Sequence, residues 1–171
     1  MAKAVIGIAK TEQQATSIVN SLKEAGFSNN DVSVLLPDRA GSRDFAHEHH
    51  TKAPEGAATG AVAGGVAAGV LGWLAGIGTL AIPGVGPLIA AGPILAALSG
   101  AAAGGAVGGL AGALVGFGIP EYEAKQYEGK VKNGNILISV HTEDSKERNV
   151  AKEIFDQAHA SDISSTGEAR V

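Results

Sequence analysis

The sequence has no cysteine and few aromatic residues, with one Trp, two Tyr and four Phe among 171 positions. Without cysteine there can be no disulfide, thiolate nucleophile or cysteine-based zinc or iron–sulfur site. Thirteen Lys and Arg stand against 17 Asp and Glu, which gives a net charge of -4. Because a nucleic-acid interface needs clustered positive charge, we expect no nucleic-acid partner.

Charge is also absent from the middle of the chain. No Asp, Glu, Lys or Arg occurs in the 65 residues from 56 to 120, and Gly and Ala fill 37 of these positions. All charged residues therefore lie in the flanks. We interpret the chain as one domain formed by residues 1–37 and 121–171, interrupted by a polar linker over 38–55 and an uncharged insert over 56–120.

Each flank predicts a β-α-β unit. In the first flank, the apolar run 4–10 precedes Thr11 and Gln14, which have the spacing of a capping box at the start of a helix. Apolar residues then recur at helical spacing as far as Gly26, where a left-handed residue would end the helix. The run 31–37 is typical of a second strand.

The second flank repeats this order, with a strand over 135–141, a helix cap at Asp144 and a short strand at 162–164. Two such units predict an α+β fold of the ferredoxin-like type, βαββαβ, with a four-stranded antiparallel sheet and two helices on one face. In this plan the second and third strands are neighbours, so the insert leaves and re-enters the domain at one place. An extra helix is predicted over 121–133, because acidic residues come first, lysines come last and Gly134 follows.

Within the insert, Gly recurs at every fourth position in several groups. Residues four apart lie on one face of a helix, so each group forms a smooth ridge on which another helix can pack closely. The predicted helix-packing residues are Gly60, Gly64, Gly65, Gly69, Gly72, Gly76, Gly100, Gly104, Gly108, Gly112 and Gly116. Two Pro and two Gly in segment 82–87 predict a reversal of the chain. We therefore predict an α-helical glycine-zipper hairpin with arms at about 57–82 and 88–119.

The environment of this hairpin follows from its length and composition. Each predicted arm exceeds the ~20 residues with which a helix crosses a bilayer. In water such arms are poor helices, because each interior Gly costs about 0.8–1.0 kcal/mol relative to Ala. We predict a hairpin inserted in a lipid bilayer, with both flanks on one side, and the basic residues near its two ends permit this to be the cytoplasmic side. Two alternatives stay open: a cytoplasmic homo-oligomer that buries the hairpins between copies, and low-complexity disorder.

One cluster of side chains has the composition of a metal site. His47, His49 and His50 lie beside Asp44 and Glu48, and imidazole with carboxylate can bind zinc. We favour the interpretation of the same residues as a solvated or headgroup-level linker ahead of the insert, because no Cys assists and the cluster lies in a polar segment. No dinucleotide, phosphate-loop or nucleophile motif accompanies them. We expect no catalytic residue and no cofactor, and hence a protein that is not an enzyme.

Three stretches of sequence resemble a known family. They are residues 51–57 (TKAPEGA), 118–128 (GIPEYEAKQYE) and 134–140 (GNILISV). They are similar to bacterial general stress proteins of the heat-induced YflT-like type, over nearly the whole chain and most distinctively at 118–128. The resemblance implies a stress-associated protein of the bacterial inner membrane, with both flanks cytoplasmic and without an established catalytic residue. Related sequences are labelled as relatives of ActD, the membrane-anchoring subunit of a quinol-oxidising respiratory complex, so an accessory subunit of such a complex is a further alternative.

These observations together give one leading hypothesis. The chain is expected to be a non-enzymatic, stress-associated membrane protein that self-associates through its glycine zipper, as a homo-oligomer.

Overall fold

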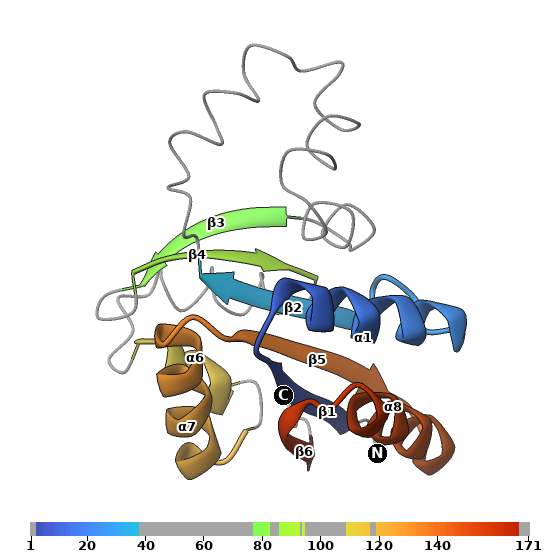
Figure 1. The fold of residues 1–171 in the computed structure, drawn as a ribbon. Helices are drawn as coiled ribbons and strands as arrows, with labels where there is room; N and C mark the ends of the chain where they lie inside the picture. Colours follow the sequence, from blue (N-terminus) through green and yellow to red (C-terminus); the bar gives the residue numbers. More distant parts are fainter. Residues whose placement is uncertain are drawn as a thin grey trace.

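The computed structural model describes residues 3–37, 77–82, 86–92, 94, 109–116 and 119–167. In these residues one antiparallel sheet, with strand order β3-β4-β2-β5-β1-β6, has helices packed against it (Figure 1). The strands are β1 (Lys3–Ala9), β2 (Val32–Pro37), β3 (Ile77–Ile82), β4 (Gly86–Ala91), β5 (Ile136–Thr142) and β6 (Ser161–Gly167). The helices are α1 (Glu12–Glu24), α6 (Gly109–Gly116), α7 (Glu121–Lys132) and α8 (Ser145–Gln157). The predicted α+β class is confirmed.

The two flanks form the two predicted β-α-β units, β1-α1-β2 and β5-α8-β6. The helix of each unit starts with a side-chain cap. The Thr11 hydroxyl accepts a hydrogen bond from the Gln14 N–H at 3.1 Å, and the Asp144 carboxylate accepts one from the Glu147 N–H at 2.8 Å. The side chains of Gln14 and Glu147 accept bonds from the N–H groups of Lys10 and Glu143, one residue before each cap, so each cap is reciprocated much as in a capping box.

The strands of the two units interleave in the sheet. β1 pairs with both β5 and β6, and β2 pairs with β5 from Val32↔Val140 to Leu35↔Leu137. The pairing of β2 with β5 confirms the prediction that the second and third strands of the units are neighbours. Because the strands within each unit do not pair with each other, neither unit contains a sheet of its own.

One face of the sheet is covered by α1 and α8, which lie side by side (Figure 1). We call the cluster beneath them the first core; its members include Ile18 and Leu22 from α1, Phe155 from α8, and Val34 and Val140 from the sheet. Gly7 of β1 allows α8 to come this close, because a Cβ there would lie 2.6 Å from the Phe155 ring. The helices therefore bury the apolar positions that the sequence spacing had indicated.

The opposite face of the sheet is covered by α6 and α7. We call this cluster the second core; its members include Leu110 and Leu114 from α6, Tyr127 from α7, and Ile6 and Leu88 from the sheet. The sheet is thus covered on both faces, and the second helical layer consists of the predicted extra helix and the end of the insert. At its C-terminal end α7 is followed by Gly134, with φ +99°, where the sequence predicts a stop.

The predicted helical hairpin is wrong for residues 77–82 and 86–91, which form strands. They make a β-hairpin in which Ile82 pairs with Gly86, so the predicted reversal at 82–87 is confirmed. Strand β4 then pairs with β2, from Val34↔Ala91 to Pro37↔Leu88. Strand β2 is buried on both faces. Without β4 it would be an edge strand of the sheet, and its backbone N–H and C=O groups on that edge would be unpaired beside its apolar side chains.

The side chains of β4 explain why a strand fits here better than a helix. Leu88 and Ala90 lie in the second core, whereas Ala91 lies in the first core and Ile89 packs against it. This alternation has the two-residue period of a strand. The strands also fall in the interval between Gly76 and Gly100, where no two glycines are four residues apart.

Elsewhere in the insert, the prediction of a helical second arm is confirmed for one segment. Residues 109–116 are helical, as predicted for the second arm. Apart from Gly92, Ile94 and Ile119, the remaining residues of both arms lie outside the part of the chain that the structure describes, as does the linker over 38–55.

Candidate functional site

Helix α6 carries those predicted helix-packing residues that the structure describes, Gly112 and Gly116. The others lie outside the described residues: Gly60, Gly64, Gly65, Gly69, Gly72, Gly76, Gly100, Gly104 and Gly108. Successive residues of a helix are about 100° apart, so these glycines lie on the side of α6 largely opposite to Leu110 and Leu114. Leu110 and Leu114 are buried in the second core, Gly112 is half-buried, and Val115 is 42% exposed.

Both ends of α6 are hydrogen-bonded to residues outside the helix. At its start, the Glu128 carboxylate of α7 accepts a hydrogen bond from the Ala111 N–H at 2.6 Å. At its end, the Ile119 N–H donates to the Leu114 carbonyl at 3.1 Å. These bonds and the buried leucines fix α6 against α7 and the sheet.

Helix α7 is in turn attached to strand β6 by polar contacts. The Tyr127 hydroxyl donates to the Asp162 carbonyl at 2.7 Å, and the Ser164 hydroxyl donates to the Glu123 carboxylate at 2.8 Å. Lys130 forms an ion pair with the Asp162 carboxylate at 3.6 Å. Asp162 has a left-handed φ of +52°, which orients its carbonyl within this polar cluster. Together these contacts make α7 a fixed support for α6.

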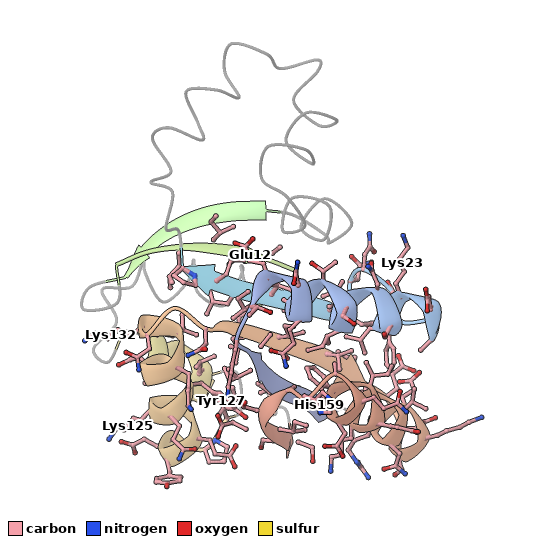
Figure 2. The ribbon with its side chains drawn as sticks, viewed as in Figure 1. Glu12, Lys23, Lys125, Tyr127, Lys132 and His159 are labelled. Carbon is pink, nitrogen blue, oxygen red and sulfur yellow. The ribbon has the colours of Figure 1, made fainter. Side chains whose placement is uncertain are left out.

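Tyr127 is the most perturbed titratable group among the described residues. Figure 2 shows its side chain on the side of α7 that faces β6, with Lys125 on the outer side. Burial raises the pKa of the Tyr127 phenol well above its usual value, and the negative charge of Glu123 raises it further. The hydroxyl therefore stays protonated at neutral pH, and its environment is that of a structural hydrogen-bond donor.

The chain after β4 is tied to the sheet by a tight turn. Gly92 has a φ of +89°, and a Cβ there would lie 2.2 Å from the Val32 carbonyl oxygen. Two residues later, the Ile94 N–H donates to the buried Ser33 hydroxyl at 3.2 Å. Only glycine fits this position without displacement of the backbone. The insert is thus attached to the sheet at β4 and again at α6.

The predicted metal cluster of His47, His49 and His50 lies outside the described residues, so its geometry is untested. Among the residues that the structure describes, no group of three or more His, Asp or Glu side chains is placed to hold a metal ion. In the same residues, none of the helices combines the length and apolar character needed to cross a membrane. His141, near the end of β5, is half-buried and donates its backbone N–H to the Asp31 carbonyl at 2.7 Å.

Sequence reasoning missed the role of Glu128. It is one of several charged residues on α7, and its partner is a backbone N–H group 17 positions away. Any residue type except proline offers such a group, so no sequence pattern marks the pair.

No family model, curated protein or solved structure matches the chain. The resemblance of residues 51–57, 118–128 and 134–140 to bacterial stress proteins stays a prediction. A function is therefore inferred from the chain's own residues, above all from α6 and its attachments.

Proposed function

We propose that the chain is a non-enzymatic, stress-associated protein that self-associates through a glycine ridge, defined as Gly100, Gly104, Gly108, Gly112 and Gly116. The orientation of α6 carries this proposal. Its buried leucines, Leu110 and Leu114, face the second core, so Gly112 and Gly116 lie on the side turned away from it. Without side chains on that side, a second backbone can approach closely and gain packing contacts.

The scaffold behind the ridge is a ferredoxin-like unit split by the insert. The strand order β2-β5-β1-β6 and the placement of α1 and α8 on one face support this assignment. In this arrangement the insert is an elaboration of the connection between the second and third strands of the unit. The unit serves as a platform that holds Gly112 and Gly116 of the ridge in a fixed direction.

A second copy of the chain is the expected partner of the ridge. The ridge and its sequence neighbours from 56 to 120 carry no charge of their own, so they offer a partner no electrostatic recognition. Small residues on one helix pack best against a similarly smooth helix, and the same patch on a second copy meets this condition. Closed symmetric dimers, in which one patch contacts itself, are the commonest oligomers of soluble proteins.

A soluble assembly is favoured over a membrane-inserted hairpin by the lengths of the connecting segments. Residues 95–108 separate Ile94 from α6, and these 14 residues would form a helix only about 21 Å long, against a hydrocarbon core of about 30 Å. Residues 56–76 are long enough for one crossing, but β2 and β3 belong to the same sheet, so the chain between them must return to its starting side.

The membrane-inserted form is the second candidate, with the lipid bilayer as partner and the inner membrane as location. It is supported by the 65 residues without charge and by the resemblance to stress proteins of membranes. Flotation of the purified protein with vesicles of phosphatidylethanolamine and phosphatidylglycerol separates the two candidates. Protein that stays at the bottom of the gradient supports the soluble assembly, and protein that floats and resists an alkaline wash supports insertion.

The proposed role of the ridge is tested by Gly112→Leu in the full chain, with Gly129→Leu as the matched control. Both changes place a leucine within a helix, but Gly129 of α7 has no atom within 4 Å of an added Cβ and lies outside the ridge. We expect Gly112→Leu to shift the mass measured by light scattering toward the monomer, whereas Gly129→Leu keeps the wild-type mass. Equal masses for all three proteins, each shown to be folded by circular dichroism, would contradict the proposal.

A further inference from the structure

Helix α6 lacks the groups that usually stabilise the start of a helix. The first N–H groups of any helix have no partner within it, and a Ser, Thr, Asp or Asn side chain commonly accepts from one of them. The residue before Gly109 in the sequence is another glycine, and the first turn of α6 contains no acidic residue. With eight residues and three of them glycine, α6 is also too short and too flexible to be stable alone.

Glu128 supplies from α7 what α6 lacks. Its carboxylate oxygen lies 2.6 Å from the nitrogen of Ala111, the third residue of α6. This is the position that a capping side chain normally serves. A carboxylate there also interacts favourably with the positive end of the helix, and hydrogen bonds to charged groups are about twice as strong as neutral ones.

The support of Glu128 is rigid. The preceding residue, Tyr127, is buried in the second core and bonded to β6, and Glu123 and Lys130 attach the same helix to Ser164 and Asp162. The carboxylate is therefore held at a fixed place in front of α6. The cost of ordering this long side chain is reduced because its backbone is already fixed.

We propose that Glu128 is a clamp that holds α6 on the sheet and so fixes the direction of the glycine ridge. Without this bond the first turn of α6 would open, and Leu110 and Leu114 would be free to leave the second core. The ridge would then no longer be held on the outer side of a fixed helix. The link from the clamp to self-association rests on the proposed function, whereas the clamp itself does not.

The clamp is tested by hydrogen exchange on the full chain with Glu128→Ala, Glu128→Gln and the control Glu121→Ala. We expect Glu128→Ala to speed exchange of the α6 amides roughly ten-fold, as for the loss of a helix cap, with α1 and α8 unchanged. Glu128→Gln keeps an oxygen that can accept the bond but loses the charge, so its effect should be intermediate. Glu121 pairs with Lys125 in solvent, and its removal should leave α6 unchanged.

Two results would overturn the clamp: α6 exchange in Glu128→Ala equal to that of the control, or exchange that rises equally in α1, α8 and α6. The second result would show that Glu128 acts on global stability and not on α6. The mass of each variant separates this inference from the proposed function. Faster exchange confined to α6, together with a wild-type mass, would support the clamp and contradict its link to self-association.

Discussion

The two faces of the sheet are covered by helices that begin in different ways. On the first face, α1 and α8 are capped by their own sequence neighbours, Thr11 and Asp144. On the second face, α6 is capped by Glu128, which belongs to another helix. The helices of the first layer therefore have local signals that specify them before any packing occurs, whereas α6 of the second layer depends on a contact that exists only in the folded protein.

The largest expected effect on the free energy of unfolding comes from comparing a buried residue of the first core with a buried residue of the second core. Phe155→Ala removes a fully buried ring from the first core and should lower the free energy of unfolding by about 3–5 kcal/mol, measured by urea denaturation. Leu114→Ala removes a buried side chain of α6, but α6 is expected to open locally, so its effect on global unfolding should be less than roughly half as large. Equal losses would show that the two layers unfold as one unit and would remove the distinction.

A smaller effect is expected where the insert joins the sheet. Gly92→Ala places a side chain at a left-handed φ of +89° and against the Val32 carbonyl, so both strain and a clash oppose it. Gly26→Ala is the matched control, because Gly26 has a similar φ of +98° but no atom within 4 Å of an added Cβ. The control should lose about 1–2 kcal/mol through backbone strain alone. Thermal denaturation should show a larger loss of stability for Gly92→Ala than for Gly26→Ala, and amide hydrogen exchange in β4 should be faster. Equal losses of stability would mean that the turn adapts to the added side chain.

The smallest expected effect on stability concerns Tyr127, whose hydroxyl attaches α7 to β6. Tyr127→Phe leaves the Asp162 carbonyl without its donor and should lower the free energy of unfolding by about 0.5–1.5 kcal/mol near neutral pH. The folded-state pKa of Tyr127 is raised, while a phenol in the unfolded chain has a pKa of about 10. Below about pH 10 both states keep the proton; above it the unfolded chain releases a proton that the folded protein retains, so the stability due to Tyr127 is lost as pH rises.

The alkaline part of this prediction is checked by unfolding free energies measured from about pH 8 to 11. The difference between wild type and Tyr127→Phe should shrink above about pH 10. Tyr122→Phe is the control, since Tyr122 is 74% exposed and should change neither the stability nor its pH dependence. A difference that stays constant with pH would contradict the assignment of a raised pKa to the buried phenol.

The predictable parts of the fold depend on residues close in sequence. The capping box at Thr11, the cap at Asp144 and the left-handed glycines that follow α1 and α7 were all found from spacing, because each partner lies within a few residues. The β-α-β units follow from the same short-range signals. Their interleaved pairing was predicted from the order of the elements, which limits how two such units can share a sheet.

The parts that the sequence did not predict depend on distant partners. Residues 77–82 and 88–91 were assigned to helical arms because glycine spacing was extended past the interval in which it holds. The hairpin that they form is stabilised by the pairing of β4 with β2, which lies about 50 positions earlier and cannot be recognised as a partner from local composition. The bond from Glu128 to α6 is similar, since the accepting carboxylate and the donating backbone are matched only after the helices have packed.

The interleaving of strands has a consequence for the protein during its synthesis. β1 leaves the ribosome first, yet finds a neighbour only when β5 appears, since Lys3 pairs with Thr142. β2 can pair earlier with β4, but its other edge stays unpaired until β5 appears, since Val32 pairs with Val140. Contacts of such long sequence separation slow folding and prolong the exposure of aggregation-prone segments. A nascent chain of this protein is therefore expected to need protection until β5 has been translated.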